Sequence, residues 1–411
     1  MLDRVAKVLD WYCCDHCLGR QFSQLLSGYT NAERGHALRT ALALAIDSGA
    51  KFEGINPGNF VDFTFRTNHD FQKLEKKEGV CEVCNGFFQG GLEKLAGKIA
   101  KHVSKTGFST FLVGTQLSQD LLDREEKLWS KVGIDFAEPL RAEMNREVGK
   151  KVEILTGKHA ELKKPDIAVL LDLGTGKVNI TVHPLFIFGY YKKLKRGFPQ
   201  SKWGTPMHYR TSIEEEIGRP LVKLAGGKDT KFHGAGREDI DARCLDWRAF
   251  VIEIEKPSKR TIDLRKLEKM VARGRKVAVS KLRISDMATV RKIKEASPDK
   301  SYRALVSLKS AIRQKDLAKL RELVGTINQQ TPQRVLHRRA ELLRRRDVKT
   351  LKWKLLAPKK LELVVSGSSG LYIKELVSGD NGRTKPSVAE LLGVEAKVTE
   401  LDVVRIGKIS L

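Results

Sequence analysis

The spacing of apolar residues changes several times along the 411-residue chain, and each spacing predicts a different kind of element. Residues 2–12 and 35–47 place apolar side chains three or four positions apart, which predicts helices. Residues 59–66 alternate apolar with polar side chains, which predicts a strand. From 88 to 157 the pattern is mainly helical around a short apolar strand at 109–114. The N-terminal part is therefore expected to combine helices with short strands.

A strand-rich block follows these helices. Residues 167–173 are apolar, the Gly-Thr-Gly-Lys at 174–177 supplies turn residues, and residues 178–182 alternate. Together they predict a β-hairpin. Residues 184–191 predict one further strand, which runs directly into a group of lysines.

Aromatic and basic residues are adjacent at the end of this block, in Tyr190, Tyr191, Lys192 and Lys193. Proteins bind RNA by stacking bases on aromatic rings and by neutralising phosphates, so Lys192 and Lys193 are candidate RNA contacts. The alternative is the end of a core strand with solvated lysines. The unit that ends with residues 193–203 resembles the end of a THUMP domain, a small α/β module that binds tRNA in modifying enzymes.

Helices and strands also share the C-terminal part, after a linker at 197–209 that is rich in glycine, proline and serine. Ser212 is expected to cap a helix that Gly218 and Pro220 interrupt. Further helices are predicted at 263–273, 286–296, 310–323 and 388–392. Further strands are predicted at 248–255, 277–283, 301–308, 361–365 and 398–406. The chain is therefore expected to have an α+β fold.

The chain is strongly cationic, with 76 Lys and Arg against 50 Asp and Glu and a formal net charge of +26. Such a charge attracts polyanions, so RNA or DNA is the default partner and an anionic membrane surface is the alternative. The longest apolar runs have the length of a strand, which argues against a membrane span. The first four residues include an acid and lead into a helical pattern, unlike a secretory signal. We expect a cytoplasmic protein without membrane contact and, because no heptads occur, a monomer.

Cations are densest in residues 331–360, which hold 11 Lys and Arg against two acids. Arg334, His337 and Arg338 recur at helical spacing, so a basic helix is expected here. Its charges repel one another unless a polyanion covers them, which makes Arg338 and Arg339 candidate RNA contacts. The alternative is a solvated basic helix.

Four of the six cysteines form two Cys-x-x-Cys pairs. A two-residue spacing lets both thiolates of a pair reach one tetrahedral ion, so these four predict a structural zinc site. The predicted ligands are Cys14, Cys17, Cys81 and Cys84. Because 63 residues separate the pairs, the site would join the first helix to a distant segment. The alternatives are two unrelated cysteine pairs, each forming its own knuckle, buried free thiols, or a redox site. The presence of two Cys-x-x-Cys pairs favours metal binding over a redox site.

The stretch Gly-Arg-Glu-Asp-Ile-Asp-Ala-Arg at 236–243 combines acids with arginines, directly after a run of turn residues. Asp239 and Asp241 alternate, so on an extended strand they would share one face. Arg237 and Arg243 lie on either side of them. By itself the stretch fits either a turn with surface salt bridges or a site that holds a carboxylate between arginines.

Three motifs, in order along the chain, resemble those of pseudouridine synthases. Gly-Arg-Glu-Asp (236–239) has the form of the motif that carries the catalytic aspartate. Ser-Tyr-Arg-Ala-Leu-Val (301–306) is similar to a strand that carries a tyrosine. Ser-Ser-Gly-Leu-Tyr-Ile-Lys-Glu-Leu (368–376) resembles the motif whose basic residue pairs with that aspartate, with Lys374 where many other families have arginine.

Longer strings narrow the resemblance. They are Phe-His-Gly-Ala-Gly-Arg-Glu-Asp-Ile-Asp-Ala-Arg, Arg-Val-Leu-His-Arg-Arg-Ala, Gly-Asp-Asn-Gly-Arg-Thr-Lys-Pro and the knuckle Cys-Asp-His-Cys-Leu-Gly-Arg. They look like the archaeal and eukaryotic family of tRNA pseudouridine synthases that has a cysteine-rich THUMP region at its N-terminus. The resemblance covers nearly the whole chain.

The resemblance implies an α+β protein in three parts. These are a zinc-binding region of helices and strand at 1–95, a THUMP-like RNA-binding region at 96–203, and a pseudouridine synthase catalytic domain at 204–411. For the catalytic domain it implies a mixed, mainly antiparallel sheet flanked by helices.

For function, the resemblance implies isomerisation of uridine at positions 54 and 55 in the T arm of tRNA, with no organic cofactor. Asp239 is the implied nucleophile or base, and Lys374 would keep it ionised. Tyr302 would stack on the flipped uracil. Arg237 would fill the space that the base leaves or contact a phosphate. The remaining candidate RNA contacts are Tyr372, Arg338, Arg339, Arg383, Lys192 and Lys193.

The rival interpretation is a non-catalytic tRNA-binding protein or chaperone, in which Asp239 is incidental. Three motifs in order argue against it. Other enzymes that carry THUMP domains fit less well, because no Pro-Cys-x-x-Cys follows a His-x-Glu as in base deaminases. Every Gly-Lys also lacks the following Ser or Thr of a phosphate-binding loop.

Overall fold

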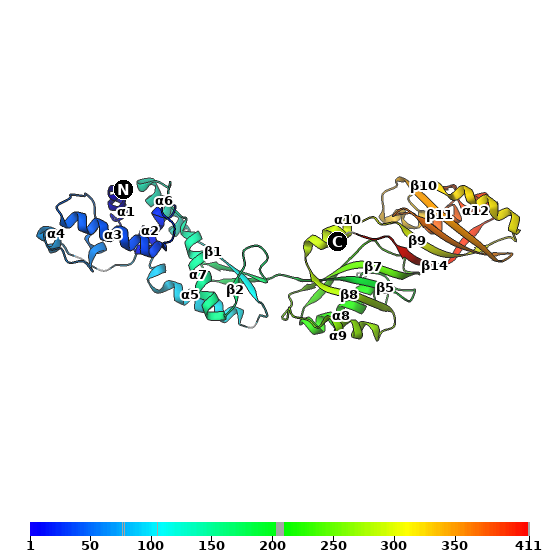
Figure 1. Cartoon of the computed structure of the whole chain (residues 1–411), viewed down its shortest axis with the longest axis horizontal. Helices are drawn as coiled ribbons and strands as arrows, with labels where there is room; N and C mark the ends of the chain where they lie inside the picture. The colour runs from blue at the N-terminus through cyan, green and yellow to red at the C-terminus, as the bar shows by residue number, and fades with distance from the viewer. Residues whose placement is uncertain (76, 78, 105, 203–208, 410–411) are drawn as a thin grey trace. The chain divides into compact units, whose positions relative to one another are not determined.

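The computed structural model describes residues 1–75, 77, 79–104, 106–202 and 209–409, apart from the side chain of Arg338. The chain forms two compact units, Met1–His183 and Pro184–Leu411 (Figure 1). Each unit has its own sheet and its own core, which confirms the predicted α+β class. Within the described residues, none of the helices has the length and apolar character that a membrane span requires.

The N-terminal unit begins with helices and ends with a small sheet. Its α-helices are α1 (Leu2–Val8), α2 (Asp15–Gly19), α3 (Asn31–Asp47), α4 (His69–Lys73), α5 (Leu92–Val103), α6 (Gln119–Val132) and α7 (Leu140–Thr156). Three short helical turns of other types are η1 (Arg20–Phe22), η2 (Pro57–Phe60) and η3 (Phe87–Gly91). Its strands are β1 (Thr110–Gln116), β2 (His159–Ala160), β3 (Ile167–Asp172) and β4 (Val178–Val182).

The segment around the first cysteine pair is fixed by close helix packing. A Cβ at Gly35 of α3 would lie 1.9 Å from the carbonyl oxygen of Asp15 in α2, so only glycine allows this approach. Arg39 of α3 donates to the Asp15 carboxylate (2.8 Å) and to the carbonyl oxygen of Cys13 (2.5 Å). Helix α3 therefore holds the first knuckle in place from its side chains and its backbone.

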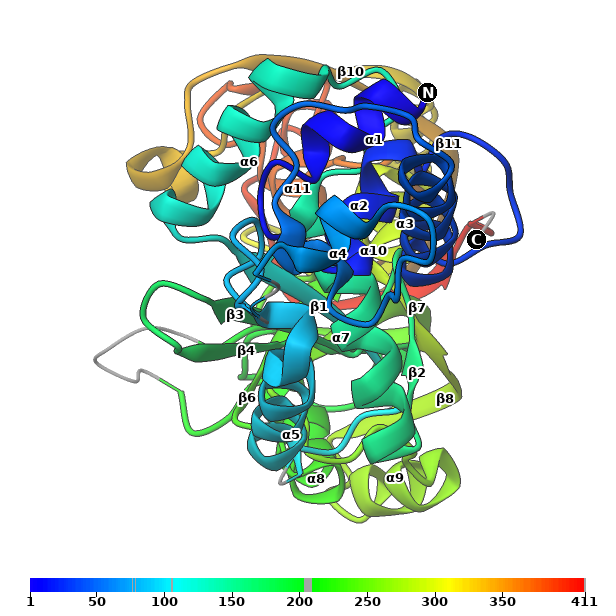
Figure 2. The same cartoon turned by 90° about the vertical axis from the view of Figure 1, so that its left-hand side faces the viewer.

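The small sheet has the strand order β2-β1-β3-β4. Strand β1 is parallel to β2 and β3, whereas β3 and β4 are antiparallel, which confirms the predicted hairpin. Helices α5 and α7 pack on each other, and α7 also packs on β1 (Figure 2). One continuous apolar core joins these elements to the cysteine-rich segment.

The C-terminal unit is built on one large sheet. Its strands are β5 (Leu185–Lys193), β6 (Asp229–Gly234), β7 (Ala242–Glu255), β8 (Val277–Ser285), β9 (Lys300–Leu308), β10 (Gly325–Gln330), β11 (Leu343–Ala357), β12 (Lys360–Gly367), β13 (Thr384–Lys385) and β14 (Ala396–Ile406). Its helices are α8 (Ile213–Ala225), α9 (Leu264–Ala272), α10 (Met287–Glu295), α11 (Ile373–Ser378) and α12 (Val388–Leu392), with the 3₁₀ helices η4 (Gln314–Leu323) and η5 (Gln333–Arg338).

The strand order is β13-β10-β11-β12-β9-β14-β7-β5-β8, and β6 pairs with β7 beside this path. The pair of β14 with β7 is parallel, and the other described pairs in this sheet are antiparallel. Helices α8 and α9 cover one face of β5 and β7 around Tyr191 and Phe250. Helix α10 packs on the opposite face around Phe188. The predicted mixed, mainly antiparallel sheet flanked by helices is confirmed.

Some predicted elements are wrong. Residues 59–66 form no strand, because their phenylalanines pack on one another and on Phe71 beside η2. Half of the stretch 331–360 is the long strand β11, held by pairing with β10 and β12. Arg334 and His337, whose spacing predicted a basic helix, lie on the short 3₁₀ helix η5. Helix α8 continues through Pro220, held by its buried apolar face. The segment predicted as a helix at 310–323 forms the 3₁₀ helix η4.

The boundary between the units also differs from the expected one at 203/204. Strand β5 pairs with β7 and β8, so it belongs to the sheet of the C-terminal unit. The compact N-terminal unit accordingly ends at His183. Residues 203–208, which contain the expected boundary, lie outside the described residues.

Candidate active site

The motif at 236–241 forms a loop between β6 and β7. Gly236 has a φ of +77°, and a Cβ there would lie 3.0 Å from Nζ of Lys300, so the position requires glycine. Asp239 and Asp241 lie on this loop and not on an extended strand. Both carboxylates nevertheless face the same cation, Lys374.

The buried side of this loop is anchored by Glu238, whose side chain is 1% exposed. Its carboxylate accepts from the Tyr191 hydroxyl (3.0 Å) and pairs with Arg248, whose Nε lies 3.2 Å away. A buried charge is costly unless it is paired, so these contacts fix the position of Glu238. The next residue in the chain is Asp239.

The backbone of the loop is held on both sides of Asp239. Nζ of Lys193 donates to the carbonyl oxygens of Asp239 (3.2 Å) and Ile240 (2.8 Å). Gln200 donates to the carbonyl oxygen of Gly236 (3.0 Å). Burial lowers the pKa of Lys193 to about 8. The loop is thus fixed from below, and its exposed side carries the carboxylate of Asp239.

The carboxylate of Asp239 lies between two cations. Nη2 and Nη1 of Arg334 lie 3.2 and 3.4 Å from its two oxygens. Nζ of Lys374 lies 3.3 Å from Oδ2. The side chain is 35% exposed, so a substrate can reach it. The structure therefore brings Asp239 and Lys374 together, as the third motif implies.

Lys374 lies closer to Asp241 than to Asp239, with Nζ 2.7 Å from each Asp241 oxygen. Burial opposes ionisation of Asp241, but its hydrogen bonds with Lys374 and the charges of Lys374 and Arg334 outweigh burial and lower its pKa. Arg243, which follows Asp241 in the motif, binds Asp402 instead.

Arg334 is a site residue that the sequence motifs did not single out. It lies on η5, and its Nε donates to the carboxylate of Glu375, which is 5% exposed (2.7 Å). Glu375 directly follows Lys374 on α11. One turn of helix therefore supplies Lys374, which contacts Asp239, and Glu375, which holds the second cation, Arg334. The signal for Arg334 was its place at the start of the string Arg-Val-Leu-His-Arg-Arg-Ala.

Asp239 opens onto a cavity of about 570 Å³. The predicted site residues that line it are Arg237, Asp239, Tyr302, Arg339, Tyr372 and Lys374. Lys300, Arg334, Arg344 and Arg346 add further cations to its wall. A cavity with this charge favours a polyanionic substrate.

Tyr302 and Tyr372 supply the aromatic part of this wall. Tyr302 lies on β9, paired with Val365 and Val403 on the neighbouring strands, and burial raises its pKa to about 12. The hydroxyl of Tyr372 accepts from Arg339 (2.8 Å), and its backbone is bonded on both sides to Gln329. Both rings are therefore held by the sheet or by hydrogen bonds.

Four of the predicted RNA contacts are not among the residues that line this cavity. Lys193 is 1% exposed, so the expectation of a phosphate contact does not fit its place under the loop. Lys192 lies over the ring of Trp247, with 4.7 Å between Nζ and the ring centroid. Arg383 donates to Glu341 and to the carbonyl oxygen of Thr331, away from the cavity lining. The side chain of Arg338 is outside the described part of the chain.

The four predicted zinc ligands converge in the N-terminal unit. Their sulfur atoms all lie within 4.8 Å of one another, and Sγ of Cys14 is 3.8 Å from Sγ of Cys84. Tetrahedral zinc with bonds of about 2.3 Å requires sulfur–sulfur distances of about 3.8 Å. Hydrogen bonds from the neighbouring thiols, that of Cys13 foremost, lower the pKa of Cys81, whereas burial foremost raises the pKa of Cys17. The four residues fit a metal ion, as predicted from their spacing.

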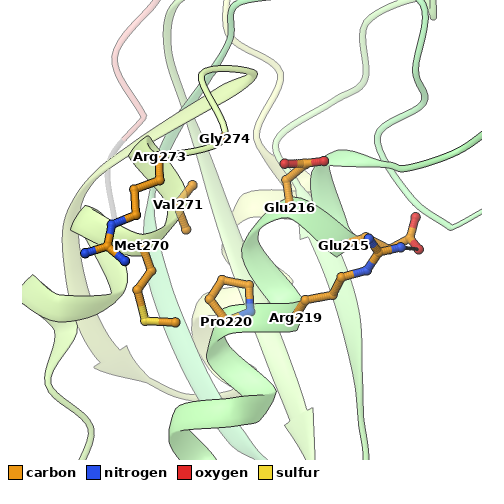
Figure 3. Close-up of a pocket in the computed structure, with 8 residues that line it drawn as sticks. All are labelled: Glu215, Glu216, Arg219, Pro220, Met270, Val271, Arg273 and Gly274. Carbon is orange, nitrogen blue, oxygen red and sulfur yellow. Dashed lines mark hydrogen bonds and ion pairs between the residues drawn. The ribbon is translucent and has the colours of Figure 1, made fainter.

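A smaller hollow of about 240 Å³ lies between α8 and α9 (Figure 3). Its acids are paired: Glu215 accepts from Arg219 (2.7 Å), and Glu216 accepts from Lys276 (2.8 Å). The first pair lies within α8, and the second ties α8 to the residue before β8, so both fit a structural role.

Comparisons with known proteins place the chain among relatives of one family. A family model described as "Pus10, C-terminal" matches residues 186–407, and one described as "Pus10 THUMP domain, archaeal" matches residues 95–172. The chain is 39% identical over 413 residues to a tRNA pseudouridine synthase Pus10 of Methanothrix thermoacetophila, covering 96% of this chain and 91% of that one. It is 37% identical to one of Thermofilum pendens (98% and 95% covered) and 36% identical to one of Pyrococcus furiosus (99% and 98% covered).

Among solved structures, a Cbf5-Nop10-Gar1 complex matches 53% of this chain and 48% of that chain with 18% identity and a TM-score of 0.31, too low to establish a common fold. The C-terminal family model spans more than half of the 411 residues. The chain therefore belongs to the Pus10 family.

Proposed function

We propose that this chain is a tRNA pseudouridine synthase, an isomerase that acts on uridines 54 and 55 of the T arm, with Asp239 as the catalytic carboxylate. The observation that carries the proposal is the place of Asp239, held between Arg334 and Lys374 at a cationic cavity. Relatives that bear this name align over nearly the whole chain.

The reaction needs one carboxylate and no donor group. The bond from C1′ to N1 of uracil breaks, the base turns, and a bond from C1′ to C5 forms, while C5 loses a proton and N1 carries one in the product. Asp239 acts at the sugar as a nucleophile or as a base. Arg334 and Lys374 fix the direction of its carboxylate, so the reacting oxygen is in place before the nucleotide binds.

The cavity suits a nucleotide that has left its stack. A base inside the folded T arm is out of reach of Asp239, so the nucleotide has to flip into the cavity. Tyr302 stacks on the flipped uracil, and Tyr372 and Arg339 contact the RNA next to it. Arg237, which is exposed at the rim, fills the space that the base leaves or contacts a phosphate.

The N-terminal unit has a supporting role in this proposal. Zinc on Cys14, Cys17, Cys81 and Cys84 ties the segment after α1 to the segment before α5, and the metal would stabilise the fold there. The region matched by the THUMP model contributes to tRNA binding. The protein acts as a monomer in the cytoplasm.

The rival, a tRNA-binding protein without catalysis, is not favoured. A binding protein has no need for a carboxylate inside a cationic cavity, where it repels phosphate. Here Asp239 is fixed there by a buried Glu238 on one side and two cations on the other.

The test uses unmodified tRNA transcript and purified protein with no added cofactor. Carbodiimide labelling followed by primer extension is expected to show stops at positions 54 and 55. Transcripts with cytidine at position 54 or at position 55 assign each stop. Absence of pseudouridine anywhere in the tRNA, with tRNA binding intact, would favour the binding protein, and pseudouridine at other positions would correct the target.

A further inference from the structure

The aromatic and basic run at the end of β5 is divided between the two faces of the sheet. Tyr191 and Lys193 point into the core and under the catalytic loop, where both are buried. Tyr190 and Lys192 face the opposite side, because successive residues of a strand alternate. The part of the run that stays accessible is thus on a face that the proposed reaction does not use.

A hollow of about 390 Å³ lies on this opposite face. Tyr190 lines it together with Ala249 on β7 and Ser280 on β8, its partners in the strand register. Arg248, the residue before Ala249, lines the catalytic cavity. The sheet therefore separates the hollow from the catalytic cavity.

Aromatic rings and cations surround this hollow. Trp247 lines it and is 38% exposed, a large fraction for an indole, with Lys192 over its ring. Lys281 and Lys408 line it from β8 and from the segment after β14, and both are exposed. Lys281 has a φ of +53° where the register of β5 and β8 shifts, and such bulges redirect side chains.

The acid in the hollow is occupied by the backbone. Asp246 accepts from its neighbour's backbone N–H at Trp247 (2.8 Å) and from that of Ile406 (2.7 Å). These bonds hold the end of β14 against the part of β7 that carries Trp247. The backbone at the rim of the hollow is thus fixed before a ligand binds. Lys281 and Lys408 remain available to contact an anion.

We propose that this hollow binds an unpaired nucleotide of tRNA that lies outside the stem-loop being modified. The base stacks on Trp247 and Tyr190, and the adjoining phosphates lie against Lys281 and Lys408. Aromatic side chains beside cations are what single-stranded RNA requires. The proposal rests on the proposed function in one respect only, that tRNA is the partner. Since the sheet separates the two sites, the flipped uridine and this second nucleotide belong to different parts of the tRNA.

The experiment compares full-length variants for binding to whole tRNA and to an isolated T-arm stem-loop. Trp247→Ala is expected to weaken binding of whole tRNA roughly fivefold to a hundredfold, the range for losing one stacked base, whereas Trp247→Phe keeps most of it. Lys281→Ala with Lys408→Ala is expected to weaken it too, and to reduce the dependence of log K on log salt by about 0.7 for each phosphate that is no longer neutralised. Binding of the stem-loop is unchanged in both.

The matched control is Lys319→Ala with Lys397→Ala, which removes the same charge from two exposed positions elsewhere on this unit. Equal affinity of the parent, the Trp247→Ala variant and the Lys281/Lys408 variant for whole tRNA overturns the proposal. An equal loss on the stem-loop, or an equal loss in the control variant, also overturns it. Failure of the parent to form pseudouridine is a separate outcome, because it contradicts the proposed function and leaves these binding ratios as the measure of the hollow.

Discussion

At the scale of single residues, the carboxylate of Asp239 is contacted by two cations, Arg334 and Lys374. Arg334 approaches both oxygens of Asp239, whereas Lys374 approaches one and lies closer to Asp241. Glu375 holds Arg334 from behind. Arg334 is therefore a positioning residue for Asp239, and Lys374 divides its charge between two carboxylates.

Replacing Arg334 should consequently cost more rate than replacing Lys374. Arg334→Gln is expected to lower the single-turnover rate of pseudouridine formation about tenfold to a hundredfold, which corresponds to about 1.4 to 2.7 kcal/mol in the barrier. Arg334→Lys should restore part of the rate. Binding of tRNA should change far less, because only one cation among many is removed.

Arg345→Gln is the matched control, since Arg345 is exposed on β11 and does not line the cavity. If Arg334→Gln and Arg345→Gln lower the rate equally, Arg334 acts only as one of many RNA contacts. If the Lys374→Gln variant is the slower one, Lys374 is the main partner of Asp239.

The sequence predicts the residues of this site unevenly. Asp239, Tyr302 and Lys374 lie in motifs with fixed order, so their meeting could be expected. Arg334 could not, because the sequence shows it only as one cation of a predicted basic helix, and its contact with Asp239 depends on the packing of η5 against α11. Lys193 looked like a phosphate contact, and only the pairing of β5 with β7 shows which of two adjacent lysines faces the core.

At the scale of elements, Asp402 on β14 joins four segments of the C-terminal unit. Its carboxylate, 2% exposed, accepts from Arg196 after β5, Arg243 on β7 and Arg303 on β9. Burial opposes ionisation of Asp402, but its hydrogen bonds with Arg243 and Arg303 and the charges of the arginines lower its pKa. The parallel strands β7 and β14 are therefore joined by the ion pair of Arg243 with Asp402 in addition to their backbone hydrogen bonds.

Asp402→Asn should destabilise the C-terminal unit by about 2 kcal/mol at neutral pH, less than for a fully buried pair because the arginines are partly exposed. A carboxylate with a lowered folded pKa stabilises the fold above its ordinary pKa of about 3.9 and loses this effect as pH falls. The difference between parent and variant should thus shrink below about pH 4. Denaturant unfolding at pH 7 and pH 3.5 measures it, and a constant difference would contradict this role of the charge.

Elements were predicted best where the local pattern and the pairing agree, as in the hairpin β3–β4 and in β7, β9 and β14. They were predicted poorly where long-range contacts decide. The alternating residues 59–66 pack as an aromatic cluster, and the cationic β11 is a strand because it lies between two others. The boundary at His183 was missed for the same reason, since β5 finds its partners far along the chain.

At the scale of the whole molecule, the chain consists of two compact units, and the cysteine cluster belongs to Met1–His183. We expect one zinc per chain by elemental analysis of the purified protein. Cys14→Ser with Cys81→Ser should abolish it, because only two of the four thiolates remain. Cys13→Ala is the matched control, because Cys13 adjoins the cluster without being one of its four predicted ligands, and it should retain the metal.

Removal of the metal should also separate the two units in unfolding. A structural zinc contributes directly to folding free energy, so chelation should lower the unfolding temperature of Met1–His183 and leave that of the C-terminal unit unchanged. Calorimetry of the full chain with and without chelator measures both transitions. A protein without bound metal, or a chelator effect on both transitions alike, would contradict the structural role of zinc.

Asp239, and not Asp241, is the carboxylate of the loop that is proposed to perform the reaction. The direct measurement is the single-turnover conversion of uridine to pseudouridine in tRNA by Asp239→Asn and Asp241→Asn, at protein concentrations that saturate binding. Both changes remove one charge and keep the shape of the side chain. We expect no detectable product with Asp239→Asn and a measurable rate with Asp241→Asn, and parental activity in the Asp239→Asn variant would contradict the assignment of Asp239.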